Sequence, residues 1–81
     1  MAERELARRF GEVVRRLRQG KGYSQEEFSF RAGLHQTYVS SVERGERNVT
    51  IQTAEHIATA LDTTLTDLFR EIERQPVDRG D

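Results

Sequence analysis

The stretch HQTYVSSVERGERN, from His35 to Asn48, combines amide and hydroxyl side chains with the arginines that follow them. Amides and hydroxyls donate and accept hydrogen bonds without carrying a charge. An amide can pair bidentately with the edge of adenine, and an arginine can pair with guanine or with a phosphate. These residue types therefore suit recognition of a nucleic-acid duplex, provided that one element presents them on a common face.

Other chemistries lack the residues that they need. The chain has 81 residues and no cysteine, which excludes disulfides and thiolate metal sites. Its two histidines, His35 and His56, have no carboxylate at ligand spacing, so we expect no metal and no cofactor. A chain this short buries only about 60% of its unfolded surface, which argues against a deep catalytic cavity. Without a convergent set of acid, base and nucleophile, we expect no enzyme.

Charge is divided unevenly along the chain, whose net charge of −1 is less basic than is usual for a nucleic-acid binder. Residues 1–49 hold 10 basic and 7 acidic residues, whereas residues 50–81 hold 3 and 7. Such asymmetry lets one face attract a polyanion while another repels it. The simpler alternative is charge scattered over a solvated surface.

Hydrophobic periodicity and capping signals predict the elements that position these groups. A first helix, which ends at Gly20, carries an apolar face formed by Leu6, Phe10, Val13, Val14 and Leu17. A second helix follows the capping box Ser24-Gln25-Glu26-Glu27, in which Glu27 can reach back toward Ser24, and ends at Gly33.

A third helix is expected to start at residue 36 and to end at Gly45, with Leu34 and Val39 at the positions of a hydrophobic staple. Val39 and Val42 share one stripe, so the polar residues share the opposite one. We expect this outward ridge to consist of Gln36, Thr37, Ser40, Ser41 and Arg44. The turn at Gly33 would join the second and third helices into a helix-turn-helix, with Ser29 small enough to let them approach.

Two more helices complete an all-α fold. Thr50 can cap a fourth, and Thr64-Leu65-Thr66-Asp67 is a second capping box that opens a fifth. The fifth helix carries the apolar residues Leu65, Leu68, Phe69 and Ile72. We expect residues 1–74 to form one domain and residues 75–81, QPVDRGD, to form a flexible tail.

The run from Phe10 to Phe69 resembles the Xre/Cro-type, lambda-repressor-like family of helix-turn-helix transcriptional regulators. The matching segments, in this order and spacing, are RRLRQGKGYSQEEF, RAGLHQTYVSSVERGERN and IATALDTTLTDLF. The segments TYVS and ERGERNVT most resemble the controller proteins of restriction-modification systems. Two departures are Val49, where many relatives carry proline, and Phe30, where the family usually has a polar residue.

The resemblance implies a regulator that binds double-stranded DNA sequence-specifically, as a homodimer on a near-palindromic operator, and that activates and represses its own promoter. The alternatives are a phage-type repressor and an antitoxin or other protein-interaction module with the same fold. A cytoplasmic, nucleoid-associated protein of a bacterium or phage is expected. The N-terminal segment MAERELARR has no apolar run, so we expect neither a signal peptide nor a membrane span.

The expected DNA contacts fall into two groups. The candidates for base readout are Gln36, Thr37, Ser40, Ser41 and Arg47. The candidates for phosphate contact are Gln25, Tyr38, Asn48, Thr50 and Arg16. By resemblance, Gln25 also braces the reading glutamine. Simpler alternatives stay open: Ser40 and Ser41 are ordinary surface residues, Thr50 only caps a helix, His35 only begins one, and Glu43 pairs with a nearby arginine.

Two protein contacts are also expected. The dimer interface would be the stripe Leu65, Phe69 and Ile72, and the alternative is that this stripe belongs to the interior. Glu26 and Glu27 occupy the region that touches the sigma factor of RNA polymerase in lambda repressor, so the resemblance implies a polymerase contact there. Phe30 either packs under the first helix or marks a contact surface.

Overall fold

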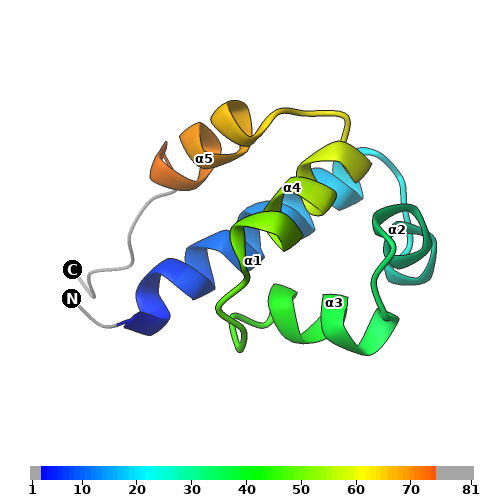
Figure 1. The fold of residues 1–81 in the computed structure, drawn as a ribbon, viewed down its shortest axis with the longest axis horizontal. Coiled ribbons are helices and arrows are strands. Elements are labelled where there is room, and N and C mark those ends of the chain that lie inside the picture. The colour runs from blue at the N-terminus through cyan, green and yellow to red at the C-terminus, as the bar shows by residue number, and fades with distance from the viewer. Residues whose placement is uncertain (1–2, 75–81) are drawn as a thin grey trace.

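A computed structural model describes residues 3–74 of the protein, and within this range every regular element is a helix. The helices are α1 (Glu3–Gly20), α2 (Gln25–Ala32), α3 (Gln36–Glu43), α4 (Ile51–Ala60) and α5 (Leu65–Arg74) (Figure 1). The predicted all-α fold of five helices, with a helix-turn-helix formed by α2 and α3, is confirmed. The expected tail, residues 75–81, lies outside the described residues.

Local signals set the ends of α2. The Ser24 hydroxyl accepts a hydrogen bond from the Glu27 backbone N–H at 3.0 Å, which satisfies one free donor at the helix start. The helix ends at Gly33, whose φ of 71° is a left-handed conformation that glycine adopts without strain. The Glu27 carboxylate, which could have reached back toward Ser24, accepts instead from Arg31 at 3.0 Å.

The starts of the later helices also follow the sequence. Thr50 Oγ1 accepts from the Thr53 N–H, and Thr64 Oγ1 accepts from the Asp67 N–H, each at 3.0 Å. Both predicted caps are thereby confirmed. The residue before α3 is His35, whose side chain is exposed and makes no capping hydrogen bond, so it begins the helix through its backbone alone.

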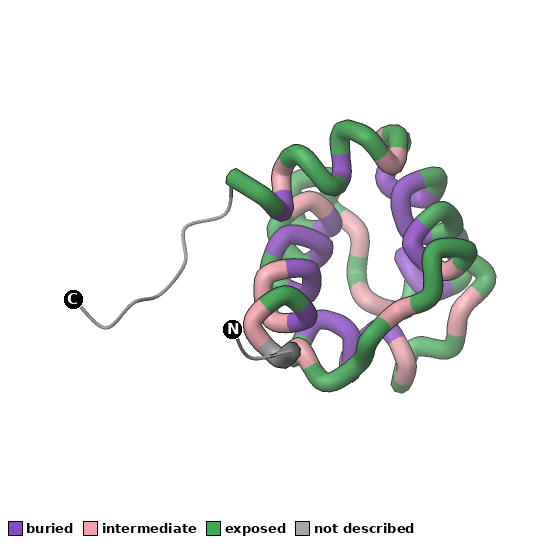
Figure 2. Tube along the Cα trace, turned by 60° about the vertical axis from the view of Figure 1, so that its left-hand side comes forward, coloured by how far each residue is buried: buried purple, intermediate pink, exposed green. Residues whose placement is uncertain are grey.

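The hydrophobic core takes side chains from all five helices. The largest fully buried side chains are Phe28, Ile57, Leu68, Val13, Val14, Val39 and Val42. In Figure 2 the buried stretches of the helices turn toward this common interior. Burying each aliphatic side chain of this kind contributes about 1.5–3 kcal/mol, so α3 is fixed to the domain mainly through Val39 and Val42.

Two glycines let α1 approach the C-terminal end of α3. A Cβ atom on Gly11 would lie 2.2 Å from the carbonyl oxygen of Val42, so no larger residue fits there without moving the backbone. Gly45 has a φ of 77°, and a Cβ atom there would lie 2.9 Å from the Cα atom of Arg8. The distance between α1 and α3 is therefore set by the absence of side chains at these two positions.

Candidate nucleic-acid interface

The N-terminal half of α3 presents two uncommitted polar side chains to solvent. Gln36 and Thr37 are exposed, and neither side chain makes a hydrogen bond within residues 3–74. On the opposite side of the helix, Val39 and Val42 are each 1% exposed. The predicted exposure of Gln36 and Thr37 is confirmed, and both keep their full hydrogen-bonding capacity for a ligand.

Ser41 does not lie on this exposed edge, and its expected place on the outward ridge is wrong. The residue is 5% exposed, and its hydroxyl donates to the carbonyl oxygen of Tyr38 at 2.7 Å. A division of α3 into one apolar and one polar stripe assumes a single packing partner. Here α3 packs against both α1 and α2, so more than one stripe is covered.

Arg47 is held beside the end of α3 by two contacts. Its Nε atom donates to Ser41 Oγ at 3.1 Å, and its guanidinium carbon lies 5.4 Å from the centre of the Tyr38 ring. Both contacts leave the terminal nitrogens of the guanidinium available. Ser41 therefore positions Arg47, a role that its sequence position did not suggest.

The other arginine at this end of α3, Arg44, is bound within the molecule. Its Nε and Nη2 atoms donate to the two carboxylate oxygens of Glu46 at 3.0 and 3.1 Å, and its Nη1 atom donates to Ser40 Oγ. The hydrogen bonds that Arg44 donates to the Glu46 carboxylate, assisted by the negative charge of Glu46, raise the pKa of Arg44 above its usual value. Ser40, half-buried, is thus an acceptor for Arg44 before any ligand binds.

A buried ion pair fixes the end of α3 to α1. Arg18 and Glu43 are 8% and 9% exposed, and Arg18 Nε lies 2.7 Å from Glu43 Oε2. Arg18 Nη2 donates to Glu43 Oε1 at 3.1 Å, and Arg18 Nη1 donates to the Tyr23 carbonyl at 2.7 Å. The prediction that Glu43 pairs with an arginine is confirmed, and removing one member of such a buried pair costs about 3–5 kcal/mol.

In the free protein Gln25 joins this ion pair and makes no hydrogen bond to Gln36, so its bracing role on DNA stays a prediction. Its Nε2 atom donates to Glu43 Oε1 at 3.0 Å. Gln25 is the first residue of α2, so the contact ties α2 to the last residue of α3. The second N–H of its amide and its carbonyl oxygen stay available for a ligand.

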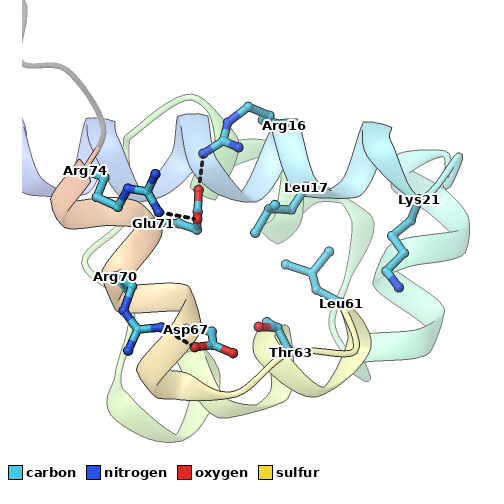
Figure 3. Close-up of a pocket in the computed structure, with 9 residues that line it drawn as sticks. All are labelled: Arg16, Leu17, Lys21, Leu61, Thr63, Asp67, Arg70, Glu71 and Arg74. Carbon is cyan, nitrogen blue, oxygen red and sulfur yellow. Dashed lines mark hydrogen bonds and ion pairs between the residues drawn. The ribbon is translucent and has the colours of Figure 1, made fainter.

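Arg16, the expected phosphate contact on α1, faces α5 and not α3. Its Nη2 atom lies 3.1 Å from Glu71 Oε1 on α5, within a groove of about 520 Å³ between α1 and α5 (Figure 3). In Figure 1, α5 and α3 lie on opposite sides of α1.

The segment after α3 carries the remaining expected phosphate contacts. Asn48 and Thr50 are both exposed, between α3 and α4. Thr50 Oγ1 accepts from the Thr53 N–H and donates to Thr53 Oγ1, both at 3.0 Å. The Thr50 hydroxyl is therefore already used to cap α4, whereas the Asn48 side chain makes no hydrogen bond within the described residues.

Three exposed apolar side chains line one groove formed by α1, α4 and α5. Leu6 is 54% exposed, Ile51 is 77% exposed and Phe69 is 41% exposed, and the groove has a volume of about 770 Å³. Of the expected dimer stripe, Phe69 is exposed, Leu65 is half-buried, and Ile72 lines the groove but is only 3% exposed and belongs mainly to the core. Leu6 continues the apolar periodicity of α1 and Ile51 is an apolar residue at the start of α4, so the local sequence does not distinguish either from the core.

The surface of α2 combines acidic and apolar exposure. Glu26 and Glu27 are exposed, and Phe30 is 87% exposed, so this ring does not pack under α1. In residues 3–74, no three or more His, Asp or Glu side chains lie close enough together to hold a metal ion. No helix in that range is long and apolar enough to cross a membrane.

Comparison with known proteins gives consistent matches in sequence. A family model described as helix-turn-helix matches residues 14–68. The chain is 43% identical over 68 residues to control protein C.MunI of Mycoplasma sp, a match that covers 83% of this chain and 92% of that protein. It is 45% identical over 61 residues to control protein C.BamHI of Bacillus amyloliquefaciens, covering 74% of this chain and 75% of that protein.

Solved structures similar to this chain also include restriction-modification controller proteins. The restriction-modification controller protein C.AhdI from Aeromonas hydrophila superposes with a TM-score of 0.75 at 46% identity, covering 78% of this chain and 96% of that chain. The controller protein C.Esp1396I, whose structure is a tetramer in complex with its natural 35 base-pair operator, superposes with a TM-score of 0.81 at 30% identity. That match covers 86% of this chain and 92% of the other.

Proposed function

This chain belongs to the helix-turn-helix family, among the control proteins of restriction-modification systems, and from that premise we propose that it regulates transcription by binding a near-palindromic DNA operator as a homodimer. The observation that carries this function is the exposed edge of α3, where Gln36 and Thr37 are uncommitted and Arg47 is held near the C-terminal end of the helix. The major groove of B-DNA admits one α-helix and displays a distinct pattern of donors and acceptors for each base pair.

Each candidate contact then has a defined part. Gln36 pairs with an adenine, Thr37 meets a base edge or a thymine methyl group, and Arg47 uses its terminal nitrogens on a guanine or a phosphate. The half-buried hydroxyl of Ser40 lies on the same edge. The phosphate contacts come from the flanks of the helix and are Gln25, Tyr38, Asn48 and Thr50.

The second copy of the chain is proposed to cover the apolar groove lined by Leu6, Ile51 and Phe69. Three of the four exposed large hydrophobic side chains in the described residues gather there. A twofold dimer would place two α3 helices about 34 Å apart, facing successive turns of the duplex. A single α3 helix reads too few base pairs to select a site alone, so dimerisation is part of the function.

A selection experiment tests DNA recognition directly. Random-sequence duplexes bound by the protein should converge on a near-palindromic site, and its affinity should fall steeply with the logarithm of salt concentration. If no sequence is enriched at moderate salt, the fold serves as a protein-interaction module instead. An adjacent methyltransferase gene and endonuclease gene would support the controller role against that of a phage-type repressor.

Activation is proposed to use the exposed acidic start of α2, through contact with the sigma factor of RNA polymerase in the cytoplasm. The double variant Glu26→Gln with Glu27→Gln should lower activated transcription in vitro several-fold, because it removes the charges that polymerase would meet. Operator affinity, measured in parallel, should not fall. Equal losses of activation and affinity would show that these carboxylates support DNA binding and not a polymerase contact.

A further inference from the structure

Arg44 is held in the free protein by a contact that a bound duplex would have to displace or accommodate. Three of the five N–H groups of its guanidinium are used, two by Glu46 and one by Ser40. The pair is solvated, because the Arg44 and Glu46 side chains are each 55% exposed. An exposed ion pair of this kind contributes little to stability, so the fold does not depend on it.

The position of this pair places it beside any DNA that α3 reads. Arg44 follows α3 directly and stands four residues after Ser40 and seven after Thr37, so the three lie along one edge of the helix. If that edge faces the major groove, the flanking phosphate backbone approaches Arg44 and Glu46 together. A phosphate and the Glu46 carboxylate would then compete for the same guanidinium donors.

We propose that Glu46 is an affinity-limiting residue, which keeps Arg44 from contacting DNA phosphates and thereby weakens binding to duplex DNA of any sequence. This inference rests on the proposed DNA-binding function. Phosphate contacts carry no sequence information, and they supply nearly all the affinity for non-operator DNA. Restraining one arginine therefore reduces capture by the large excess of unrelated sequence, while Gln36, Thr37 and Arg47 remain available for readout.

The test is the variant Glu46→Gln, with binding to the operator and to an unrelated duplex measured over a series of salt concentrations. Affinity for both duplexes should rise about threefold to tenfold at moderate salt. The slope of log affinity against log salt should steepen by about 0.9, the value for one added phosphate contact. The gain should disappear in the double variant Arg44→Gln with Glu46→Gln, because the released arginine is then absent.

Asp67→Asn is the matched control. Asp67 pairs with Arg70 on α5 at 2.6 Å, both side chains are exposed to a similar degree, and the substitution removes one negative charge (Figure 3). It should change affinity and salt slope much less than Glu46→Gln does, because α5 lies on the other side of α1 from α3.

Three outcomes would overturn the inference. Glu46→Gln and Asp67→Asn could behave alike, or the gain could persist without Arg44, or Glu46→Gln could weaken operator binding, which would make Glu46 a positioning residue for Arg44. These outcomes differ from failure of the proposed function, in which the wild-type protein itself shows no preference for any duplex. Thermal unfolding of each variant should be measured to check that the fold is intact.

Discussion

At the scale of single residues, the polar groups around α3 divide into free and restrained side chains. The side chains of Gln36 and Thr37 make no hydrogen bond to any of residues 3–74, so binding a base does not require them to give one up. Arg47 and Arg44 are restrained, the first by Ser41 and Tyr38 and the second by Glu46. The hydroxyl and the ring orient the Arg47 guanidinium without neutralising it. The Glu46 carboxylate orients Arg44 but also competes with phosphate for its N–H donors.

The contribution of Gln36 can be measured with Gln36→Ala. Losing a bidentate amide contact should reduce discrimination at one base pair of each half-site by about 1–3 kcal/mol. Competition binding against operators with single base-pair changes would reveal this as a flattened preference at one position. Gln19→Ala, at an exposed amide on α1, is the control and should leave the preference unchanged.

Base readout by Gln36 would be contradicted if Gln36→Ala lowered the affinity for every DNA sequence equally. It would identify the Gln36 amide as a phosphate contact, because phosphates are the same at every base pair. Base selection would then have to come from Thr37, Ser40 and Arg47.

At the scale of elements, α3 is positioned by contacts with α1 that lie far from it in the sequence. Gly11 allows α1 to contact the backbone of the last turn of α3, and the Arg18–Glu43 ion pair holds the same end of α3 against α1. Gln25 extends this pair to the start of α2. The exposed edge of α3 is therefore presented by a rigid support and not by a loop, which suits a surface that must match a groove.

Gly11→Ala should destabilise the domain although alanine is the better helix former. Its Cβ atom would lie 2.2 Å from the Val42 carbonyl oxygen, and overpacking of this kind costs about 1–3 kcal/mol or more. The gain in helix propensity is about 1 kcal/mol. Urea unfolding should show a net loss of up to about 2 kcal/mol in the free energy of unfolding, and more if the backbone must move.

The substitution Gly20→Ala, at the end of the same helix, separates the steric clash from the gain in helix propensity. No atom lies within 4 Å of a Cβ atom built there, so this variant should be as stable as the wild type or more stable. If Gly11→Ala were equally stable, α1 and α3 would not be in direct backbone contact.

At the scale of the whole molecule, the apolar groove and the edge of α3 are joined by one short segment. Arg47 and Asn48 follow α3 and line the same groove as Leu6 and Phe69. A partner chain in the groove would therefore lie next to the DNA-facing residues, and dimerisation would help to fix their position. Operator affinity should accordingly depend on the monomer–dimer equilibrium.

Ile51→Asp should shift that equilibrium toward the monomer. Ile51 is 77% exposed and is the first residue of α4, where a carboxylate favours the helix start, so the monomer should fold normally. A carboxylate buried in an apolar interface should raise the dimer dissociation constant at least tenfold, about 1.4 kcal/mol. Sedimentation velocity over a range of concentrations measures this directly.

Phe30→Asp is the matched control for the interface, because Phe30 is 87% exposed on α2 and outside the groove. It should leave the dimer intact. If Phe30→Asp separated the protomers and Ile51→Asp did not, the interface would lie on α2 and the groove would have another role.

The number of helices and most of their ends were predictable because the signals are local. Ser24, Thr50 and Thr64 cap the helix that follows each of them, and Gly33 ends α2 with a positive φ. Each of these interactions involves residues at most a few positions apart. The resemblance to helix-turn-helix regulators was visible for the same reason, since order and spacing along the chain carry it.

Only the tertiary structure decided which sides of the helices remain exposed and which arginines are free. Periodicity identifies one apolar stripe but does not tell how many neighbours a helix has, so the pattern predicts surface positions for Ser41 and Ile72 although both are buried. The partners of Arg16 and Arg18 lie 55 and 25 residues away. Such long-range pairs depend on how the helices pack, which no local pattern records.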